Sequence, residues 1–411
     1  TMDYFDDLET RDPEVREQAL LAELSNQIDN AIRNAPGWAK ILSDVQPADL
    51  NSREALAGLP ITRKSELNTR QKDDPPLGGL TTAASNELDW VFCSPGPIYE
   101  PGARGGDFWR MGRALYAAGF RRGDTVHNTF AYHLTPAGHM MEAGAHACGC
   151  VVIPGGVGNT EQQLQTISHI QPKGYVGTPS FLRILLEKAT ELGFDVSSIT
   201  SAAVGGEALP PSLRDYFRSH GIHVLQSYGT ADLGLVAYES PAMEGMILDE
   251  SVIVEIVRPG TGDPVNEGEV GEVVVTTLNP IYPLIRFATG DLSAILSGQS
   301  PCGRTNTRIK GWMGRADQTT KVKGMFVHPK QIAEVIARHS EIKRARLVVD
   351  NIDHVDVMTL HCEASDCSDQ LRNEIAVSLQ AVCKLKGDVA LSQPGSLAND
   401  GKVIDDIRTY E

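Results

Sequence analysis

Between about residues 89 and 226, short apolar runs alternate regularly with longer amphipathic stretches, and few folds accommodate such a pattern. We expect strands at 90–93, 125–130, 150–153, 174–176, 202–204 and 223–226, and helices at about 107–119, 136–147, 160–170, 180–192 and 211–219. Short strands that alternate with helices are typical of βαβ units. The sequence therefore predicts an α/β protein whose sheets are mainly parallel and are accompanied by helices.

The segments on either side of this region predict further parts of the fold. A helix is expected over 13–35, because Asp12 can cap it and Pro13 suits its first position. Residues 251–296 are β-rich and predict a separate subdomain, with strands near 251–257 and 272–277. The chain from 317 onward predicts a small α+β unit, with helices at 330–339 and 368–384 and strands near 345–350 and 356–362. We therefore expect a large N-terminal domain over 1–316 and a small C-terminal lid domain over 317–411.

Charge and composition disfavour several classes of partner. The 411 residues include 37 Lys and Arg against 53 Asp and Glu, a formal net charge of −16 at pH 7. This balance opposes binding to nucleic acid and to anionic membrane surfaces. No run approaches the roughly 18 apolar residues of a transmembrane helix, and seven scattered cysteines favour reduced thiols over disulfides. We expect a cytoplasmic protein without nucleic-acid or membrane partners; its oligomeric state, a homodimer included, stays open.

Two segments place a carboxylate shortly after a predicted strand. Residues 227–232 read Ser-Tyr-Gly-Thr-Ala-Asp, so that Thr230 and Asp232 can serve a phosphate oxygen and a hard cation respectively. Asp291 follows Gly290 and can accept hydrogen bonds from ribose hydroxyls, as acids do in nucleotide folds. A plain polar turn would explain each segment equally well when it is taken alone.

Two further segments and the order of all four identify a family resemblance. Residues 314–324 read Gly-Arg-Ala-Asp-Gln-Thr-Thr-Lys-Val-Lys-Gly, and Gly401-Lys402 lies near the C-terminus. In this order the segments resemble the motifs of the adenylate-forming (AMP-binding) enzymes, with Asp232 where the family has Glu. The segments 152–160, 204–208 and 302–305 are similar to the phenylacetate–CoA ligase branch in particular. The resemblance covers about residues 10–411.

The resemblance implies an ATP-dependent carboxylic acid–CoA ligase that forms an acyl-adenylate and then an acyl-CoA thioester. It implies ATP/AMP, Mg²⁺ and coenzyme A as cofactors, and an aromatic or similar small carboxylic acid as the substrate. Lys402, Thr230 and Asp232 would be catalytic, and Asp232 would hold Mg²⁺. Asp317 would be a hinge. The nucleotide would contact Gly206, Glu207, Ser227, Tyr228, Gly229, Thr230, Asp291 and Arg315, and the thioester step would use Lys321, Lys323 and Gly324.

The acid pocket is the part of the site on which the resemblance says least. In the branch, the segment after the second strand lines this pocket, which points to Phe130, Tyr132, His133 and Gly138. Phe130 and Tyr132 can stack on an aromatic acid. They can equally pack in the core, and His133 can equally cap the following helix, so both interpretations stay open.

The phosphate loop departs from the family. Where the family has Ser-Ser-Gly-Thr-Thr-Gly-Lys-Pro, residues 94–101 read Ser-Pro-Gly-Pro-Ile-Tyr-Glu-Pro, which keeps Ser94 and Gly96 but places Glu100 at the lysine position. Two prolines remove backbone donors, and Glu100 introduces a negative charge. The branch also often carries Cys and His after its Tyr-Gly motif, whereas Ser240 and Met246 stand here, so no structural zinc is expected.

These departures keep alternative functions open. One alternative is an adenylating enzyme that passes the acyl group to a carrier protein or an amine. The other is a nucleotide- or acyl-adenylate-binding protein that has lost adenylation. Retention of Asp232, Asp291, Arg315, Asp317 and Lys402 favours catalysis.

Overall fold

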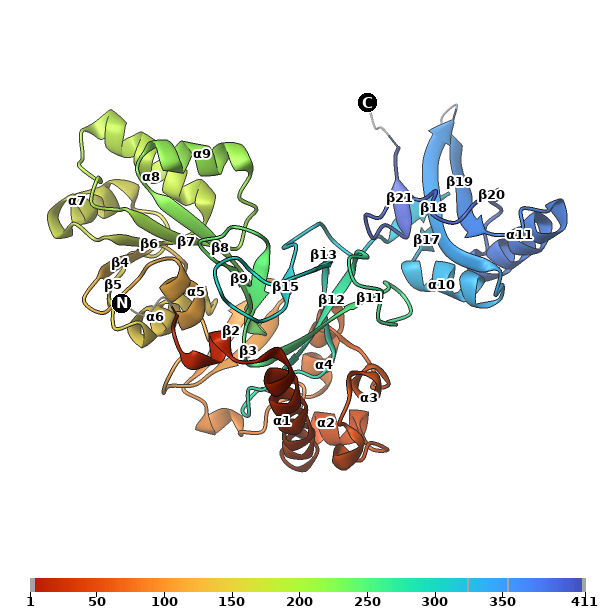
Figure 1. Ribbon diagram of the computed structural model, residues 1–411, viewed down its shortest axis with the longest axis horizontal. Coiled ribbons are helices and arrows are strands. Elements are labelled where there is room, and N and C mark those ends of the chain that lie inside the picture. Colours follow the sequence, from red (N-terminus) through yellow and green to blue (C-terminus); the bar gives the residue numbers. More distant parts are fainter. Residues whose placement is uncertain (1–3, 324, 353–354, 409–411) are drawn as a thin grey trace. The chain divides into compact units, whose positions relative to one another are not determined.

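The computed structural model describes residues 4–323, 325–352 and 355–408. The chain divides into two compact units (Figure 1). Unit 1 comprises Thr1–Val254, Val275–Phe287 and Ile295–Trp312, and unit 2 comprises Glu255–Val274, Ala288–Ala294 and Met313–Glu411. The domain boundary expected near Asp317 stays a prediction. Among the described residues, no helix has the length and apolar character needed to cross a membrane.

The N-terminal part of unit 1 is helical, as predicted. Helix α1 (Pro13–Asn34) begins where the Asp12 side chain accepts hydrogen bonds from the backbone of Glu14 and Val15. Its buried residues, Leu20, Leu24, Ile28 and Ala31, recur at helical spacing and form one face. The other short elements here are α2 (Pro36–Ile41), α3 (Arg53–Ala57), α4 (Leu67–Asp73), η1 (Asp7–Thr10), η2 (Pro47–Asp49), η3 (Lys64–Glu66) and η4 (Ser85–Glu87).

A nine-stranded sheet forms the centre of unit 1. The strands from β5 to β8 in the spatial order lie parallel, and the remaining neighbours are antiparallel. Parallel pairing follows from the helical crossovers that separate these strands in sequence. The order is β14 (Ile295–Leu296), β15 (Arg308–Ile309), β10 (Met246–Leu248), β9 (Gly234–Glu239), β8 (His223–Thr230), β7 (Ser201–Val204), β6 (Gly174–Gly177), β4 (Thr125–Asn128) and β5 (Val151–Pro154).

Helices cover both faces of the parallel strands. Successive side chains of a strand point to opposite faces, so Ala203 packs with α5 (Gly112–Ala117) and α6 (Ala137–Ala147), and Ala202 packs on the other side. That other side is covered by α7 (Thr160–Ile170), α8 (Pro179–Leu192) and α9 (Pro211–Ser219). Two-sided burial explains why β6 and β7 are fully or mostly buried short runs, whereas β4 also buries the polar His127 and Asn128.

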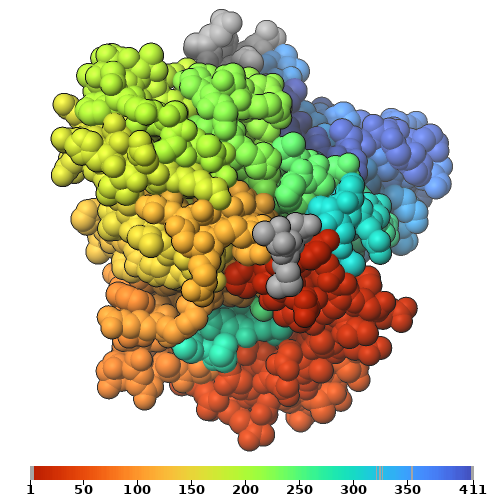
Figure 2. Space-filling model, turned by 60° about the vertical axis from the view of Figure 1, so that its left-hand side comes forward, coloured from red at the N-terminus to blue at the C-terminus, as the bar shows by residue number. Residues whose placement is uncertain are grey.

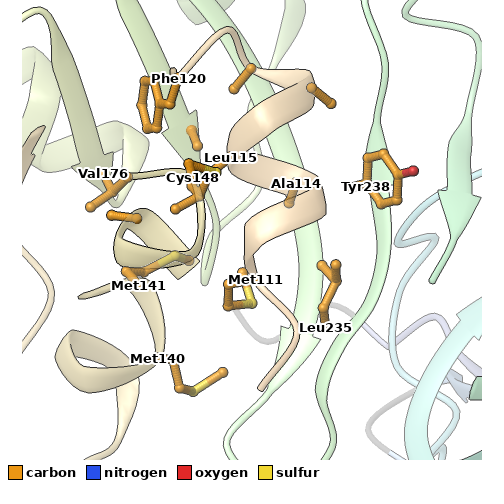
Figure 3. Packing of buried hydrophobic residues seen from close by; sticks show 14 of the residues in the cluster. Met111, Ala114, Leu115, Phe120, Met140, Met141, Cys148, Val176, Leu235 and Tyr238 are labelled. Carbon is orange, nitrogen blue, oxygen red and sulfur yellow. The ribbon is translucent and has the colours of Figure 1, made fainter. Parts of the chain in front are cut away.

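The core beneath α5 shows how closely these layers pack. In Figure 3, Ala114 and Leu115 of α5 lie between Leu235 and Tyr238 of β9 on one side and the methionines of α6 on the other. The Tyr238 ring is buried, and its hydroxyl donates to Glu9 Oε1 at 2.7 Å. Helix α5 is shorter than the helix expected over 107–119, because the chain before Gly112 forms a loop in place of helical turns.

The strand expected at 90–93 does not join the parallel sheet. It is β2 (Trp90–Ser94), which pairs antiparallel with β3 (Ile98–Gly102) in a separate two-stranded sheet. The prediction of a strand was right, but its place in the βαβ series was wrong. The reason is that residues 98–102 supply a hairpin partner where a helix would have been needed for a crossover.

A smaller sheet of four strands confirms the β-rich region. Its order is β1 (Thr62–Arg63), β13 (Phe287–Ser293), β12 (Gly271–Thr277) and β11 (Val252–Val257). Just before β13, the segment 279–283 passes between the N-terminal helices and the chain near residue 82. Gln27 donates to the Asn279 carbonyl at 2.7 Å and Thr82 donates to the Pro280 carbonyl at 2.7 Å, and Figure 2 shows this segment in teal between the red and orange surfaces.

The C-terminal part of unit 2 has the α+β organisation that was predicted. A four-stranded sheet has the order β20 (Asp388–Ser392), β19 (Val355–Ala364), β18 (Ile342–Ile352) and β21 (Ile404–Asp406), and β16 (Thr320–Val322) pairs with β17 (Met325–Val327). Helices α10 (Pro329–Ala337) and α11 (Asp369–Cys383) pack on the sheet through Ile332, Val335, Leu371, Ile375 and Leu379, all of them buried.

Candidate active site

The polar end of β8 is a tight turn that presents a hydroxyl and a carboxylate. Ser227, Tyr228, Gly229 and Thr230 lie in β8, and the chain reverses into β9 after Asp232. A Cβ at Gly229 would lie 2.5 Å from the Gly234 carbonyl oxygen, so only glycine fits this reversal. Thr230 Oγ1 accepts a hydrogen bond from Leu233 N at 3.1 Å, which leaves the hydroxyl proton for another acceptor.

Asp232 forms a buried ion pair that sequence analysis missed. Its Oδ2 lies 2.5 Å from Lys64 Nζ; the Asp232 side chain is inaccessible, whereas that of Lys64 is 30% exposed. Asp232 Oδ1 is buried and has no hydrogen-bond partner among the described residues. Lys64 lies 168 residues before Asp232, and no spacing in the sequence points to this pairing.

The altered phosphate loop is the hairpin β2–β3, and it buries the unexpected glutamate. Glu100 lies opposite Phe92 in the hairpin, and Ser94 Oγ donates to Glu100 Oε1. Burial, together with the Asp232 charge, raises the pKa of Glu100 to about 8, against the opposing effects of Ser94 and Lys64. At pH 7 the carboxyl is therefore mostly protonated, so the negative charge expected from the sequence is largely absent.

A third buried group belongs to the same cluster. Tyr282 is 2% exposed, and its hydroxyl has no hydrogen-bond partner in the part of the chain that the structure describes. Burial raises the pKa of Tyr282, and the charges of Asp232 and Glu100 raise it further. The Tyr282 hydroxyl is thus within electrostatic reach of both carboxyl groups. Tyr282 lies in the segment that leads to Asp291, but the sequence of this segment did not indicate that the Tyr282 hydroxyl is buried.

The chemistry of this cluster fits a hard divalent cation such as Mg²⁺, which prefers carboxylate and other oxygen ligands. Asp232 Oδ1 and Glu100 Oε2 are buried oxygens without a hydrogen-bond partner within the described ranges. No group of three or more His, Cys, Asp or Glu side chains is arranged to hold a metal ion, here or elsewhere, as far as the described residues go.

The end of β7 brings two of the predicted residues together. Gly206 has a left-handed backbone (φ +77°), and a Cβ at this position would lie 3.8 Å from Phe130 Cε1. Phe130 is therefore close to the predicted adenine segment. Glu207 is exposed, and its Oε2 accepts a hydrogen bond from Ser180 N at 3.3 Å.

Tyr132 and Gly138, two of the four residues predicted for the acid pocket, pack against each other. The Tyr132 hydroxyl donates to Glu142 Oε2 at 2.9 Å and accepts from Asn128 Nδ2 at 2.8 Å. Burial and the Glu142 carboxylate raise the pKa of Tyr132. A Cβ at Gly138 would lie 2.8 Å from the Tyr132 ring, so glycine is needed for this packing. His133 is exposed.

Unit 2 brings together the two residues predicted to bind the ribose. Arg315 Nη1 lies 2.6 Å from Asp291 Oδ1, and the two residues also pair through their backbones in an isolated antiparallel bridge. The Asp291 side chain is 12% exposed and that of Arg315 is 56% exposed. The pair therefore presents a positioned carboxylate and a guanidinium at the surface of unit 2.

The remaining predicted residues of unit 2 are more exposed. Lys402 Nζ lies 2.7 Å from Asp405 Oδ1, and the exposed Asp317 accepts from Thr319 N at 3.3 Å. Lys323 has a left-handed backbone (φ +47°), and its N–H donates to Asp356 Oδ2 at 2.8 Å. Gly324 and the side chain of Lys321 lie outside the described residues.

Comparisons with known proteins agree with the resemblance. The sequence model of the AMP-binding enzyme family matches residues 109–279. The phenylacetate-coenzyme A ligase of Aromatoleum evansii is 29% identical over 361 residues, which cover 84% of this chain and 80% of that protein. The Pseudomonas putida phenylacetate-coenzyme A ligase is 28% identical over 422 residues, with 94% of each chain covered.

A solved structure supports the fold. A 2-hydroxyisobutyryl-CoA ligase, in an open conformation with 2-HIB-AMP and CoA, matches with a TM-score of 0.72 and 24% identity. The match covers 95% of this chain and 91% of the ligase. At this identity the likeness establishes the two-unit α/β fold.

Proposed function

This chain is an AMP-binding, adenylate-forming enzyme related to the phenylacetate–CoA ligases, and we propose that it is an ATP-dependent carboxylic acid–CoA ligase. It activates a small carboxylic acid as the acyl-adenylate and then transfers the acyl group to coenzyme A. The substrate we propose is an aromatic or similar small acid. The observation that carries this proposal is the similarity to phenylacetate–CoA ligases over nearly the whole chain.

Adenylation begins with the approach of a carboxylate to a triphosphate, two anions that repel each other. Positioning and positive charge must therefore supply most of the catalysis. We assign to Thr230 a hydrogen bond to the α-phosphate, because its oxygen accepts from the Leu233 N–H and its hydroxyl proton is left to donate. Asp232, with Oδ1 buried and without a partner among the described residues, is the proposed ligand of Mg²⁺. When bound, Mg²⁺ would neutralise part of the triphosphate charge.

Nucleotide recognition is proposed to be divided among the ends of β7 and β8 and the Asp291–Arg315 pair. Gly206 and Glu207 follow β7 and are proposed to line the adenine pocket, with Ser227, Tyr228 and Gly229 of β8 beside it. Open α/β sheets bind ligands at the carboxyl ends of their strands, which is where these residues lie. The Asp291–Arg315 pair is proposed to hold the ribose, since its carboxylate is positioned and suited to accept from hydroxyl groups.

The acid is proposed to bind beside Tyr132 and Phe130. Tyr132 is fixed by hydrogen bonds to Asn128 and Glu142, so its ring offers a rigid apolar face. Phe130 lies close to Gly206 and so connects this face to the proposed adenine segment. Two aromatic rings at this place favour an aromatic or similarly flat acid.

Unit 2 is proposed to supply the groups that change between the two half-reactions. Lys402 would contact the attacking carboxylate and the phosphate during adenylation. Asp317 would be the hinge about which the C-terminal region then rotates. After this rotation, Lys321, Lys323 and Gly324 would contribute to the transfer of the acyl group to coenzyme A. The exposure of Asp317 and Lys323 is consistent with residues that exchange their contacts.

A second candidate function rests on the phosphate loop. The hairpin β2–β3 contains three prolines, of which Pro95 and Pro97 depart from the family pattern, and a buried Glu100 where the family has a lysine. This observation favours a protein that binds nucleotide or acyl-adenylate without activating acids. An adenylating enzyme with a carrier-protein or amine acceptor is a further alternative, on which the fold has no bearing.

ATP–pyrophosphate exchange with a panel of aromatic and short-chain carboxylic acids tests the proposal. We expect exchange with at least one acid, and thioester formation once coenzyme A is added. Exchange without thioester would favour the carrier-protein or amine alternative. AMP binding without exchange for any acid would favour the binding-protein alternative. Asp388→Ala, an exposed carboxylate of unit 2 outside the proposed site, is the matched control and should keep full activity.

A further inference from the structure

A cavity of about 380 Å³ lies in unit 1, and none of the residues proposed to bind the nucleotide or the acid lines it. Two tryptophans belong to its wall, Trp90 of β2 and Trp109 from the loop before α5. A Cβ at Gly102 would lie 3.3 Å from each of the two indole rings, so both rings lie beside the same glycine. A cavity of this volume with aromatic walls is suited to a small organic molecule.

Helix α6 supplies the polar side of the cavity. His139, Glu142 and His146 follow one another at spacings of three and four residues, so they share one face of the helix. Met141, in contrast, belongs to the core shown in Figure 3. The centroid of the His139 ring lies 5.3 Å from that of Trp90. His139 Nδ1 is buried and has no hydrogen-bond partner among the described residues, so it is left to bind a ligand.

The charges at the cavity favour a cation. Glu142 Oε2 accepts from the Tyr132 hydroxyl at 2.9 Å, and a carboxylate can accept several hydrogen bonds, so Glu142 has capacity left. Arg104 also lines the cavity, but its charge is balanced by Asp89, whose Oδ1 lies 3.4 Å from Arg104 Nε. The histidines apart, two carboxylates therefore face one guanidinium.

The ring of Trp90 already contacts a cation. Arg104 Cζ lies 5.3 Å from the ring centroid, which is within the range of a cation–π contact. The Arg104 side chain is 75% exposed, so it can move into solvent when another cation takes its place. Gly105 and Gly106 follow with left-handed backbones, and a Cβ at either position would meet no atom within 4 Å. The loop after Arg104 therefore leaves space for a ligand to enter.

We propose that this cavity binds a small aromatic amine in its ammonium form. The ammonium group donates to Glu142 and to His139 Nδ1, and the ring of the ligand packs on Trp90 and Trp109 in place of the Arg104 guanidinium. Aromatic faces combined with a carboxylate are suited to organic ammonium ions. An aromatic acid of the same size is disfavoured, because its carboxylate would lie against that of Glu142. The site goes beyond the proposed ligase activity and does not depend on it.

Calorimetric titration of the full-length, nucleotide-free protein with 2-phenylethylamine tests this site, with 2-phenylethanol as a neutral probe of matched size. We expect one saturable site that binds the amine at least about tenfold more tightly than the alcohol. Glu142→Gln should weaken amine binding about tenfold, because the charge is lost, and Trp90→Leu should weaken it about fivefold. Arg104→Gln should tighten binding, because it removes the competing guanidinium. Glu187→Gln, an exposed carboxylate on α8, should leave the affinity unchanged.

The opposite signs expected for Glu142→Gln and Arg104→Gln separate an ammonium site from a loss of structure, since an unfolded variant cannot bind more tightly. Equal affinities for the amine and the alcohol would overturn the proposal. Unchanged amine affinity in Glu142→Gln, with circular dichroism as in the wild type, would also overturn it. So would tighter binding of 3-phenylpropionate than of the amine, if Arg104→Gln abolished it, because the cavity would then be an anion site. Amine binding without ATP–pyrophosphate exchange would support the site and contradict the proposed activity, and exchange without amine binding would do the reverse.

Discussion

The guanidinium of Arg315 lies 2.6 Å from the carboxylate of Asp291, and the backbones of the same two residues pair in an isolated antiparallel bridge. Gly290, directly before Asp291, has a left-handed backbone (φ +78°), and a Cβ at this position would lie 2.6 Å from Arg315 Nη2. The backbone conformation favours glycine here, and the guanidinium would have to shift to admit a side chain. The arrangement fixes the Asp291 carboxylate before any ligand arrives, which reduces the entropy cost of binding.

Asp291→Ala is expected to weaken AMP binding by about 1.5–3 kcal/mol, because a charge-assisted hydrogen bond to a ribose hydroxyl is lost. Isothermal titration calorimetry with AMP measures this directly. Asp388→Ala removes an exposed carboxylate elsewhere in unit 2 and should bind AMP like the wild type. Equal affinity in Asp291→Ala and the control would rule out the ribose role.

Asp107 gives a prediction for the pH dependence of stability. Burial raises the pKa of Asp107 to about 6, against the Gly112 and Met111 N–H groups, which lower it. From about pH 4 to pH 6 the folded state therefore binds more protons than the unfolded state, and the free energy of unfolding falls as the pH rises, by up to about 3 kcal/mol. Asp107→Asn lacks this ionisation. In urea unfolding, the free energy of unfolding of Asp107→Asn should therefore rise relative to that of the wild type between pH 4.5 and 7.5. A difference between the two that stays constant with pH would contradict the raised pKa of Asp107.

Glu250 anchors the N-terminal segment of unit 1. Its Oε2 lies 2.9 Å from Arg16 Nε and 3.1 Å from Arg11 Nη2, and the side chains of Arg16 and Glu250 are 4% and 1% exposed. Glu250→Ala leaves a buried guanidinium without its counter-charge, so we expect a loss of about 3–5 kcal/mol in the free energy of unfolding. Glu187→Ala, at an exposed position, should change it by no more than about 0.5 kcal/mol. Similar urea midpoints for the two variants would show that Arg16 is compensated by its other contacts.

The elements of the fold could be predicted because local pattern determines them. Helix α7 was expected over 160–170 and is observed over the same residues, since apolar residues at helical spacing leave one face to be buried. Strands β6 and β7 could be predicted because burial on both faces makes them short runs without charged residues. The partner of β2 could not, because pairing depends on residues 98–102, whose proline, glycine and buried glutamate do not read as a strand.

The candidate residues that the sequence suggested lie within short motifs, and their roles stay predictions. Thr230 ends β8, Asp291 lies in β13, and the structure shows the pairing of Asp291 with Arg315 in unit 2. Lys64 could not be found, because its ion pair with Asp232 depends on the folded chain and leaves no trace in sequence spacing. The protonation of Glu100 could not be found either, because it follows from burial, which a residue type does not reveal.

Lys402 is held only lightly in unit 2. Its ammonium lies 2.7 Å from Asp405 Oδ1, with the lysine side chain 47% exposed. An exposed ion pair of this kind contributes at most about 1 kcal/mol. Lys402 can therefore leave Asp405 and contact a carboxylate and a phosphate during adenylation at little cost.

Lys402→Ala should abolish adenylation far more than thioester formation. The charge of Lys402 stabilises the transition state of the first half-reaction, so its loss should lower the rate rather than weaken binding uniformly. The rate from free acid and ATP is compared with the rate from presynthesised acyl-adenylate and coenzyme A. Lys386→Ala, an exposed lysine of unit 2 outside the proposed site, should match the wild type in both. A residue that served both half-reactions would lower the two rates equally, and one that served neither would lower neither rate. Either result would contradict the proposal that Lys402 acts in adenylation alone.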